Sequence, residues 1–298
     1  MSAKRDGVVS TQSVPVLILA GGFGTRISEE SSFKPKPMIE IGGIPILLHI
    51  MRHYYAHGFN DFVICAGYKA IEIKKYFMYY QVLHNDLDID HRLSFDESWK
   101  FGESDGTQEK WRVRVLDTGT DTMTGGRVAK ALKVLGRDKT FSNFAVTYGD
   151  GLSDVDLRKE YAFHLAHGEL GTVLGVKNFA RYGELNTTAL GKVSSFLEKP
   201  EDKQGFINGG FFFFRREFEQ YLAGGDSLIL ENAPLMRLAA DGQLNFYKHL
   251  GFWHAMDTLR DRTILEKLWA DNKAPWVAKP AASISHSLET EPTLEPRA

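Results

Sequence analysis

The sequence predicts an α/β protein built on a Rossmann-like, doubly wound mixed sheet with a small added β region. Short apolar runs such as Val16–Ala20 and Asp61–Ala66 alternate with helix-length segments over the first part of the chain. This alternation is typical of βαβ units. After Asn178 short strand-like segments replace the alternation, which indicates the added β region.

Local signals place each element of the first part in turn. Val16–Ala20 is continuously apolar, as expected of a strand buried on both faces. Pro45 suits the first turn of a helix, and Gly58 suits its end. The expected elements are strands over residues 16–20, 61–66, 111–116, 144–147 and 172–176, and helices over residues 45–57, 70–80, 128–135 and 156–167.

In the later part of the chain the expected elements are shorter, and the composition indicates where the folded domain ends. Strands are expected over residues 183–190, 192–197 and 206–215, and helices over residues 228–240 and 258–270. In the first part of the chain, residues 95–110 are expected to form a long loop or hairpin tip. Residues 15–277 form a single expected domain, preceded by a flexible leader over residues 1–14. Residues 278–298 hold few large apolar groups, which predicts a disordered tail.

Composition and charge exclude several classes of protein. A formal net charge of −2 over 298 residues gives no general attraction for nucleic acid or for an anionic membrane. The single cysteine, Cys65, excludes an internal disulfide framework, and its strand-like surroundings predict a buried thiol. No apolar run approaches the roughly 18 residues of a membrane span, and the apolar segment near the N-terminus leads into a glycine-rich loop. We therefore expect a cytoplasmic protein.

A glycine-rich loop over residues 21–24 directly follows the first expected strand. Glycines there allow backbone N–H groups to approach an anion closely. Arg26, Lys34 and Lys36 add three cations, and prolines restrict the backbone around the two lysines. A dinucleotide fingerprint would need glycine at Ile27, and a P-loop would need Gly-Lys-Ser/Thr where this loop has Gly-Thr-Arg. What remains is a loop suited to a polyphosphate.

Seven short motifs occur in order along residues 16–276. They are Leu19–Arg26, Lys34–Met38, Asp117–Gly119 with Met123–Arg127, Thr147–Gly151, Glu198–Pro200, Ile207–Phe211, and Gly251–Trp253 with Met256–Arg260. In these motifs the chain resembles the sugar-1-phosphate nucleotidylyltransferases. Thr118–Arg127 and Gly251–Arg260 resemble the cytidylyl branch of that family in particular. The resemblance implies the nucleotide-diphospho-sugar transferase type of fold.

The resemblance also implies a reaction. It implies an enzyme that transfers the cytidylyl group of CTP to α-D-glucose 1-phosphate by in-line displacement, giving CDP-glucose and pyrophosphate. Mg²⁺ is the implied cofactor, a homo-oligomer is the implied assembly, and deoxysugar biosynthesis is the implied setting. Such a displacement needs no protein nucleophile, so positioning and charge stabilisation would carry catalysis.

Individual residues receive roles from the same resemblance. The implied catalytic residues are Arg26 and Lys36, and the implied metal ligands are Asp150 and Asp257. The implied nucleotide-binding residues are Leu19, Ala20, Gly21, Gly22, Phe23, Gly24, Thr25, Thr122, Arg127 and Gly149, and the implied sugar-phosphate-binding residues are Glu198, Lys199, Asn208 and Gly209. Spacing alone does not pair the two aspartates, and Asp257 could equally be the N-cap of the helix expected over residues 258–270.

Several alternatives stay open at the level of the sequence. Glu184 stands where the family pattern has a small residue, and Phe23 stands where it usually has leucine. Glu184 leaves the sugar open, and the contacts to the base are too few to be read from a sequence. UTP or dTTP, or another hexose 1-phosphate, are alternative substrates. A nucleotide-sugar sensor that binds without turnover is a second alternative. A dinucleotide-dependent oxidoreductase is disfavoured by Ile27.

Other polar side chains have simple structural explanations. His49, His53 and His57 form one stripe of the helix expected over residues 45–57. No carboxylate joins this stripe to complete a metal site, so we expect surface or interface histidines. Tyr148 lies beside the implied nucleotide-binding residue Gly149, and we expect a core position for it.

Overall fold

A computed structural model gives the structure of the chain. It describes residues 11, 13–24, 34–92, 94, 99–101, 109–138, 141–177, 184–187, 193–197 and 205–277. No helix in this part of the chain combines the length and the apolar character needed to cross a membrane.

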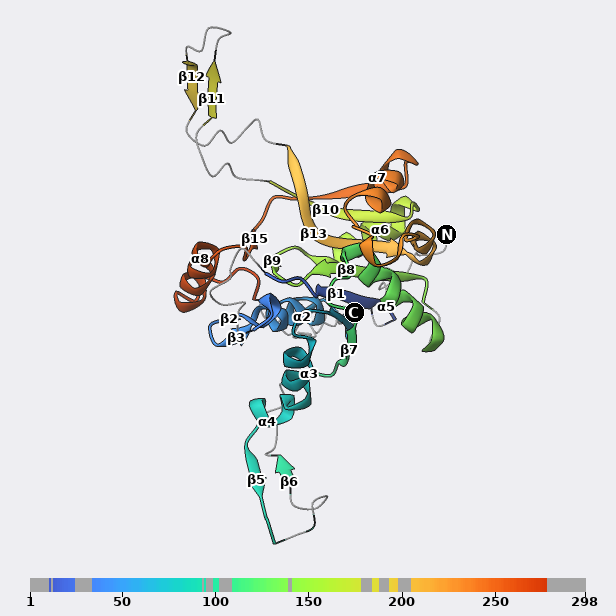
Figure 1. Ribbon diagram of the computed structural model, residues 1–298. Coiled ribbons are helices and arrows are strands. Elements are labelled where there is room, and N and C mark those ends of the chain that lie inside the picture. Colours follow the sequence, from blue (N-terminus) through green and yellow to red (C-terminus); the bar gives the residue numbers. More distant parts are fainter. Residues whose placement is uncertain are drawn as a thin grey trace, which may run out of the picture.

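A seven-stranded sheet forms the centre of the protein (Figure 1). In spatial order the strands are β14 (Leu244–His249), β10 (Gly171–Lys177), β13 (Phe206–Arg215), β8 (Asn143–Tyr148), β1 (Pro15–Ala20), β4 (Asp61–Ala66) and β7 (Arg112–Asp117). β13 runs antiparallel to both of its neighbours. The other neighbouring pairs are parallel. The predicted mixed sheet is therefore confirmed.

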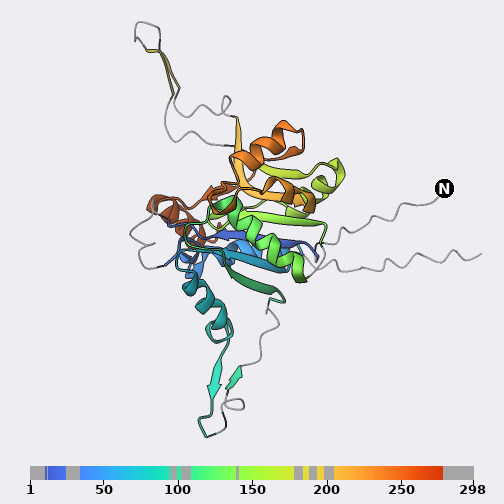
Figure 2. The same cartoon turned by 45° about the vertical axis from the view of Figure 1, so that its right-hand side comes forward.

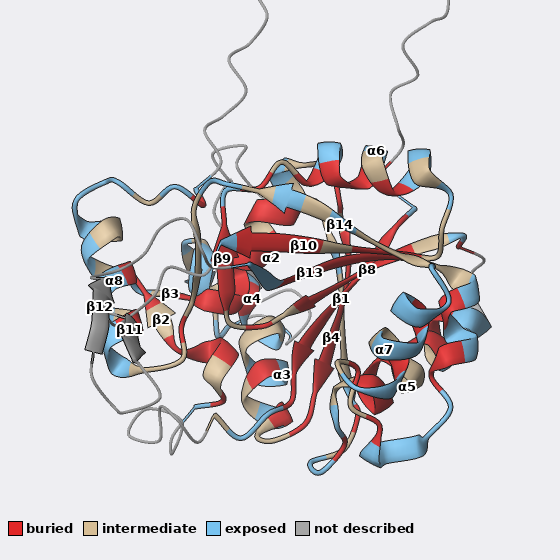
Figure 3. Cartoon of the chain, turned by 90° about the horizontal axis from the view of Figure 1, so that it is seen from above, coloured by how far each residue is buried: buried red, intermediate tan, exposed pale blue. Residues whose placement is uncertain are grey.

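Helices cover both faces of the sheet (Figure 3). They are α2 (Ile46–Ala56) and α6 (Leu157–His167) on one face, and α5 (Thr124–Asp138) and α7 (Ala233–Ala240) on the other. Val16 and Ile18 of β1 lie in the core under the first pair of helices. Leu17 and Leu19 lie in the core under the second pair. Because successive side chains of a strand point to opposite faces, this continuous apolar strand needs a helix layer on each side.

Capping residues start two of the predicted helices. The Asp156 carboxylate accepts hydrogen bonds from two backbone N–H groups in the first turn of α6. Thr258 and Asp261 form a capping box at the start of α8 (Leu259–Ala270). The helices predicted over residues 156–167 and 258–270 are thus confirmed, each with its first residue as the cap.

Shorter elements connect the sheet and its helices. They are η2 (Lys36–Met38), β2 (Glu40–Ile41), β3 (Ile44–Pro45), α3 (Ala70–Met78), α4 (Tyr80–His84), β9 (Gly151–Ser153), η3 (Arg216–Tyr221), η4 (Gly225–Ser227) and β15 (Trp253–Ala255). Two antiparallel hairpins join β5 (Leu87–Ile89) to β6 (Trp99–Phe101) and β11 (Glu184–Thr187) to β12 (Val193–Leu197). The β5–β6 hairpin ends an arm that continues from α3 and α4 away from the sheet (Figures 1 and 2). The β11–β12 hairpin is the predicted added β region.

Some predicted elements differ from the structure. The helix predicted over residues 228–240 begins only at Ala233, because Pro234 in its first turn cannot continue a helix from the residues before it. The helix predicted over residues 70–80 divides at Tyr79 into α3 and α4. β14 was not predicted, since its residues lie at the sheet edge and are not fully buried, so they form no continuous apolar run.

Two regions expected at the surface are buried. His49 and His53 are 4% and 5% exposed, and their Nε2 atoms bond to the carbonyls of Ile41 and Val155, both at 2.9 Å. The prediction of surface or interface histidines is wrong for both, because backbone carbonyls satisfy these rings inside the core. Thr11, in the predicted leader, is also buried. The rest of the leader through residue 10 and the predicted tail lie outside the described residues.

A buried carboxyl on α6 generates a prediction about stability and pH. Glu160 is 0% exposed, and among the described residues neither of its carboxylate oxygens accepts a hydrogen bond. Burial raises the pKa of Glu160 well above its usual value. Its contribution to stability is therefore complete below the ordinary carboxyl pKa and is lost as the pH rises toward the folded-state pKa.

We predict that Glu160→Gln stabilises the protein, and that the gain in Tm grows from about pH 5 to about pH 8. The substitution removes the ionisation and keeps the shape of the side chain. Thermal unfolding of the variant and the wild type across this range measures the gain. Glu217→Gln, at an exposed glutamate of η3, is the matched control and should show no such trend. A gain from Glu160→Gln that is the same at every pH would contradict the prediction.

Candidate active site

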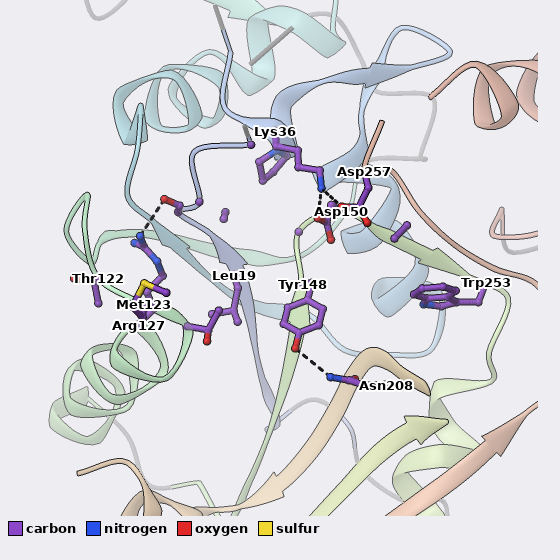
Figure 4. Close-up of a pocket in the computed structure, with 18 residues that line it drawn as sticks. Leu19, Lys36, Thr122, Met123, Arg127, Tyr148, Asp150, Asn208, Trp253 and Asp257 are labelled. Atoms are coloured by element: carbon purple, nitrogen blue, oxygen red, sulfur yellow. Dashed lines mark hydrogen bonds and ion pairs between the residues drawn. The ribbon is translucent and has the colours of Figure 1, made fainter. Parts of the chain in front are cut away.

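A cavity of about 600 Å³ opens at the carboxyl ends of β1 and β8 (Figure 4). Ligands of open α/β sheets bind at this edge. Its walls come from the glycine-rich loop, η2, the start of α5, and the region around β13 and β15. The lining residues are Leu19, Ala20, Gly21, Gly22, Gly24, Lys36, Pro37, Thr122, Met123, Thr124, Arg127, Tyr148, Gly149, Asp150, Asn208, Trp253, Ala255 and Asp257.

Lys36 joins two carboxylates in this cavity (Figure 4). Its Nζ donates to Asp150 Oδ2 at 2.6 Å and to Asp257 Oδ1 at 2.8 Å. The exposed fractions of the side chains are 13% for Lys36, 27% for Asp150 and 34% for Asp257. All three are partly shielded from water, so their attraction is stronger than that of a surface ion pair.

Pairing of two short strands brings Asp150 and Asp257 together. β9 and β15 are antiparallel neighbours, Asp150 directly precedes β9, and Asp257 follows closely after β15. The N–H of Met256 also donates to the Asp150 carbonyl at 2.9 Å. The N–H of Asp257 donates to Asp261 Oδ2 at 3.1 Å, which ties Asp257 to the capping box of α8. Asp257 is therefore not the helix cap, and its side chain is directed to Lys36.

Gly149 lets the lysine loop reach the carboxylates. Its N–H donates to the carbonyl of Leu19 at 3.0 Å. A Cβ at this position would lie 2.7 Å from that oxygen and 3.0 Å from Pro37 Cγ. Only glycine allows the end of β8 to lie this close to β1 and to the loop that carries Lys36.

Lys36 stays protonated because its partners outweigh its burial. Burial lowers the pKa of Lys36, but the charges and hydrogen bonds of Asp150 and Asp257 raise this pKa by more than burial lowers it. The pKa therefore lies above its ordinary value. Lys36 is therefore a fixed cation at neutral pH and not a general base.

The two carboxylates have the chemistry that a hard divalent cation prefers. Both line the cavity, and both keep part of their surface exposed. Mg²⁺ binds one or two protein carboxylates and keeps several waters or phosphate oxygens as its other ligands. Within the described residues no group of three or more His, Cys, Asp or Glu could hold a metal. Asp150 and Asp257 thus fit a cation shared with a phosphate-bearing ligand.

Arg127 organises the wall formed by the glycine-rich loop and the start of α5. Its guanidinium makes five hydrogen bonds to the loops around it, and the side chain is only 4% exposed. The acceptors are the carbonyls of Ala66, Gly119, Gly21 and Thr120, at 3.1, 2.8, 3.0 and 3.2 Å, and Thr118 Oγ1 at 2.6 Å. A Cβ at Gly21 would lie 2.0 Å from Arg127 Cζ, so glycine is required there.

These bonds bear on the role that the resemblance implied for Arg127. The resemblance implied that Arg127 and Thr122 bind the nucleotide. The guanidinium is instead directed at the protein backbone, and the Thr122 hydroxyl donates to the Thr118 carbonyl at 2.7 Å. Both residues line the cavity. Arg127 joins the loop over residues 118–122 to Gly21 of the glycine-rich loop, while the Thr122 hydroxyl bonds within its own loop. Arg127 is thus a positioning residue for this wall.

The opposite wall carries Tyr148, Asn208 and Trp253 (Figure 4). Asn208 Nδ2 donates to the Tyr148 hydroxyl at 3.2 Å. Trp253 Nε1 donates to the carbonyl of Gly209 at 2.7 Å. Asn208 therefore lies in the cavity as predicted, while Gly209 acts through its carbonyl on Trp253. Tyr148 lines the cavity and is not confined to the core, contrary to the prediction.

The structure brings most of the predicted site residues together. Those that line the cavity are Leu19, Ala20, Gly21, Gly22, Gly24, Lys36, Thr122, Arg127, Gly149, Asp150, Asn208 and Asp257. Phe23 does not line it; this side chain is 46% exposed, and its ring lies 5.1 Å from that of Tyr68. Thr25, Arg26, Glu198 and Lys199 lie outside the described residues, and the Glu184 side chain is likewise not described.

Six lining residues were not predicted as site residues. They are Pro37, Met123, Thr124, Tyr148, Trp253 and Ala255. Each lies within or next to a motif that the sequence singled out, so adjacency to a motif was the available signal. Whether a side chain next to a motif faces the cavity depends on the local backbone geometry, which the motif alone does not give.

Comparisons with known proteins show which proteins this chain is similar to. A family model described as nucleotidyl transferase matches residues 15–233. A glucose-1-phosphate cytidylyltransferase of Salmonella typhimurium is 43% identical over 263 residues, which cover 87% of this chain and 97% of that protein. A probable glucose-1-phosphate cytidylyltransferase of Bacillus subtilis is 39% identical over 260 residues, which cover 87% of this chain and 98% of that protein.

Solved structures share the fold at lower identity. HddC from Yersinia pseudotuberculosis superposes with a TM-score of 0.60 at 23% identity, covering 86% of this chain and 99% of that one. An apo UDP-glucose pyrophosphorylase gives a TM-score of 0.60 at 16% identity, covering 87% of this chain and 99% of that one. These structures support the α/β fold alone.

We predict that Arg127→Lys weakens CTP binding about tenfold and lowers Tm, because a lysine cannot replace the five hydrogen bonds of the guanidinium fork. Titration calorimetry measures the Kd for CTP, and thermal unfolding measures Tm. Arg137→Lys, at an exposed position near the end of the same helix, is the matched control and should leave both unchanged. Wild-type affinity and Tm in Arg127→Lys would refute the positioning role.

Proposed function

Because the chain belongs to the nucleotidyl transferase family, we propose that it transfers the cytidylyl group of CTP to α-D-glucose 1-phosphate. The products are CDP-glucose and pyrophosphate. The observation that carries this proposal is the cation–carboxylate cluster of Lys36, Asp150 and Asp257 beside a glycine-lined cavity. The 43% identity to a cytidylyltransferase over nearly its whole length supports the choice of nucleotide and sugar.

The reaction is a substitution at the α-phosphorus of CTP. A phosphate oxygen of glucose 1-phosphate forms a bond to this phosphorus while the bond to the bridging oxygen of the β-phosphate breaks. The electron pair of the broken bond leaves with pyrophosphate. The protein needs to align the two phosphates and stabilise the charge that develops on their oxygens.

Lys36 supplies the fixed positive charge for this step. Its ammonium lies at the carboxyl ends of β1 and β8, between two carboxylates and next to the bare backbone of residues 21–24. When a phosphate enters the cavity, Lys36 would exchange one of its two carboxylate contacts for a contact to a phosphate oxygen. Arg26 would stabilise the departing pyrophosphate, and Lys199 would orient the attacking phosphate with Glu198 on the sugar hydroxyls.

Asp150 and Asp257 would hold Mg²⁺, and the cation would screen the negative charges of the two phosphates as they approach each other. The aspartates are also required by Lys36 itself, because they keep its ammonium in place. One pair of carboxylates thus serves both the resident lysine and the incoming cation.

Two further features belong to the proposal. Residues 15–277 act as one catalytic domain, and the chain assembles as a homo-oligomer, as the family resemblance implies. Light scattering coupled to size-exclusion chromatography tests the assembly. A sensor that binds nucleotide sugars without turnover would not need Lys36 between two carboxylates, so the geometry favours the enzyme.

Substrate choice is tested by pyrophosphate release over a grid of nucleotides and sugar 1-phosphates. CTP, UTP, dTTP, ATP and GTP are each combined with the 1-phosphates of glucose, galactose, mannose and N-acetylglucosamine, with and without Mg²⁺. We predict release that is highest for CTP with glucose 1-phosphate and that depends on Mg²⁺. A maximum for another pair would refute the proposed specificity, and binding of CTP without any release would favour the sensor.

We predict that Lys36→Ala lowers kcat by about 10²–10³-fold while the variant still unfolds cooperatively. Steady-state pyrophosphate release and thermal unfolding provide the two measurements. The matched control is Lys34→Ala, two residues earlier on the same loop, where the ammonium pairs with Glu40 at 2.6 Å and the side chain is 54% exposed. Lys34→Ala should retain most of the activity. Near-normal turnover by Lys36→Ala would exclude the role given to Lys36.

A further inference from the structure

Glu231 connects the two walls of the cavity from behind. It lies in the turn before α7 and does not itself line the cavity. One oxygen, Oε1, accepts a hydrogen bond from the Tyr148 hydroxyl. The other, Oε2, accepts from Thr124 Oγ1 at 2.7 Å. Tyr148 belongs to the wall that carries Asn208, while Thr124 begins α5, whose first turns hold Arg127.

The Thr124 end of this connection is fixed. The Thr124 hydroxyl accepts a hydrogen bond from the N–H of Leu230 at 2.9 Å while it donates to Glu231. The turn that carries Glu231 is therefore tied to α5 at two adjacent residues. One oxygen of the Glu231 carboxylate is thus held by α5 while the other accepts from the Tyr148 hydroxyl, which restrains where that hydroxyl lies.

The bond to Glu231 fixes the hydrogen-bond roles of Tyr148 and Asn208. A tyrosine hydroxyl has a single proton to donate, and Glu231 takes it, since a carboxylate only accepts. Asn208 Nδ2 donates to the same hydroxyl, and Asn208 Oδ1 accepts from the N–H of Gly210 at 2.8 Å. The orientation of the Asn208 amide is thereby determined.

The result is a wall of defined polarity. The second N–H of Asn208 Nδ2 is the donor that this wall offers to a ligand, and the Tyr148 hydroxyl can act only as an acceptor (Figure 4). Burial, together with the charge of Glu231, raises the pKa of Tyr148, so the phenol keeps its proton at neutral pH. Without Glu231 the hydroxyl proton could rotate toward the ligand, so that Tyr148 would become a donor.

We propose that Glu231 is a positioning and specificity-determining residue that fixes the donor–acceptor polarity of the sugar wall through Tyr148. The proposal rests on the proposed function for the identity of the ligand, since the family resemblance is what implies that Asn208 binds the sugar phosphate. Glu231 selects a sugar whose hydroxyl donates to Tyr148 while another oxygen accepts from Asn208. Its effect falls on the acceptor substrate and not on the nucleotide.

A double-mutant cycle tests whether Glu231 acts through Tyr148. The variants are Glu231→Gln, Tyr148→Phe and their combination, with Asn232→Ala as the matched control. Asn232 is the next residue in the same turn, it is exposed, and its side chain makes no capping hydrogen bond. KM and kcat are measured for glucose 1-phosphate and for CTP, and Tm is measured for each variant.

We expect Glu231→Gln to raise KM for glucose 1-phosphate about tenfold and to leave KM for CTP within about twofold. In the Tyr148→Phe background the same substitution should add less than about twofold. Independent effects that multiply would overturn the proposal, as would a loss of Tm with unchanged KM values. Asn232→Ala should match the wild type in every measurement.

Failure of the proposed function can be told apart from failure of this inference. Wild-type turnover on the substrate grid is measured first, and the cycle then uses the sugar 1-phosphate that the wild type converts fastest. Coupling between Glu231 and Tyr148 on another sugar would support the inference while refuting glucose as substrate. If no sugar is converted, the cycle is measured on the Kd for glucose 1-phosphate, and absence of wild-type binding there would overturn both.

Discussion

The ion cluster in which Lys36 bridges Asp150 and Asp257 is the interaction on which the rest of the site depends. It joins three distant parts of the chain: the loop after β1, the turn between β8 and β9, and the segment that leads into α8. Two carboxylates this close to each other would repel without a cation between them. The lysine therefore allows the protein to hold, before any ligand arrives, the pair of carboxylates that a phosphate-bound cation would need.

A second set of interactions, centred on Arg127, fixes the wall formed by the glycine-rich loop and the start of α5. Arg127 donates hydrogen bonds to backbone carbonyls of the loops on this wall, and Gly21 leaves the room that its guanidinium requires. The same α5 helix reaches Glu231 through Thr124, and Glu231 reaches Tyr148. Charge and hydrogen bonds that never touch a ligand thus place the groups that do. This is how a site built from loops can be rigid enough for a displacement that depends on alignment.

The sequence predicted the strands and helices of the sheet well because apolar periodicity and caps are local signals. It could not pair Asp150 with Asp257 by spacing, since their contact depends on the pairing of β9 with β15, and neither short strand has a signal of its own. The resemblance supplied that pair. It implied a nucleotide-binding role for Arg127, but it could not show that five protein acceptors hold the buried guanidinium. Glu231 belongs to none of the motifs, because its role depends on its contacts with Tyr148 and Thr124, which are distant in the sequence.

The most direct test of the central cluster is a comparison of unfolding free energies. Lys36→Met is compared with the triple variant Lys36→Met/Asp150→Asn/Asp257→Asn by urea denaturation without added divalent cations. Removal of the ammonium should destabilise the protein, because it leaves two facing carboxylates uncompensated, and neutralising both should restore most of the lost free energy. A triple variant as unstable as Lys36→Met, or a Lys36→Met variant as stable as the wild type, would contradict the account.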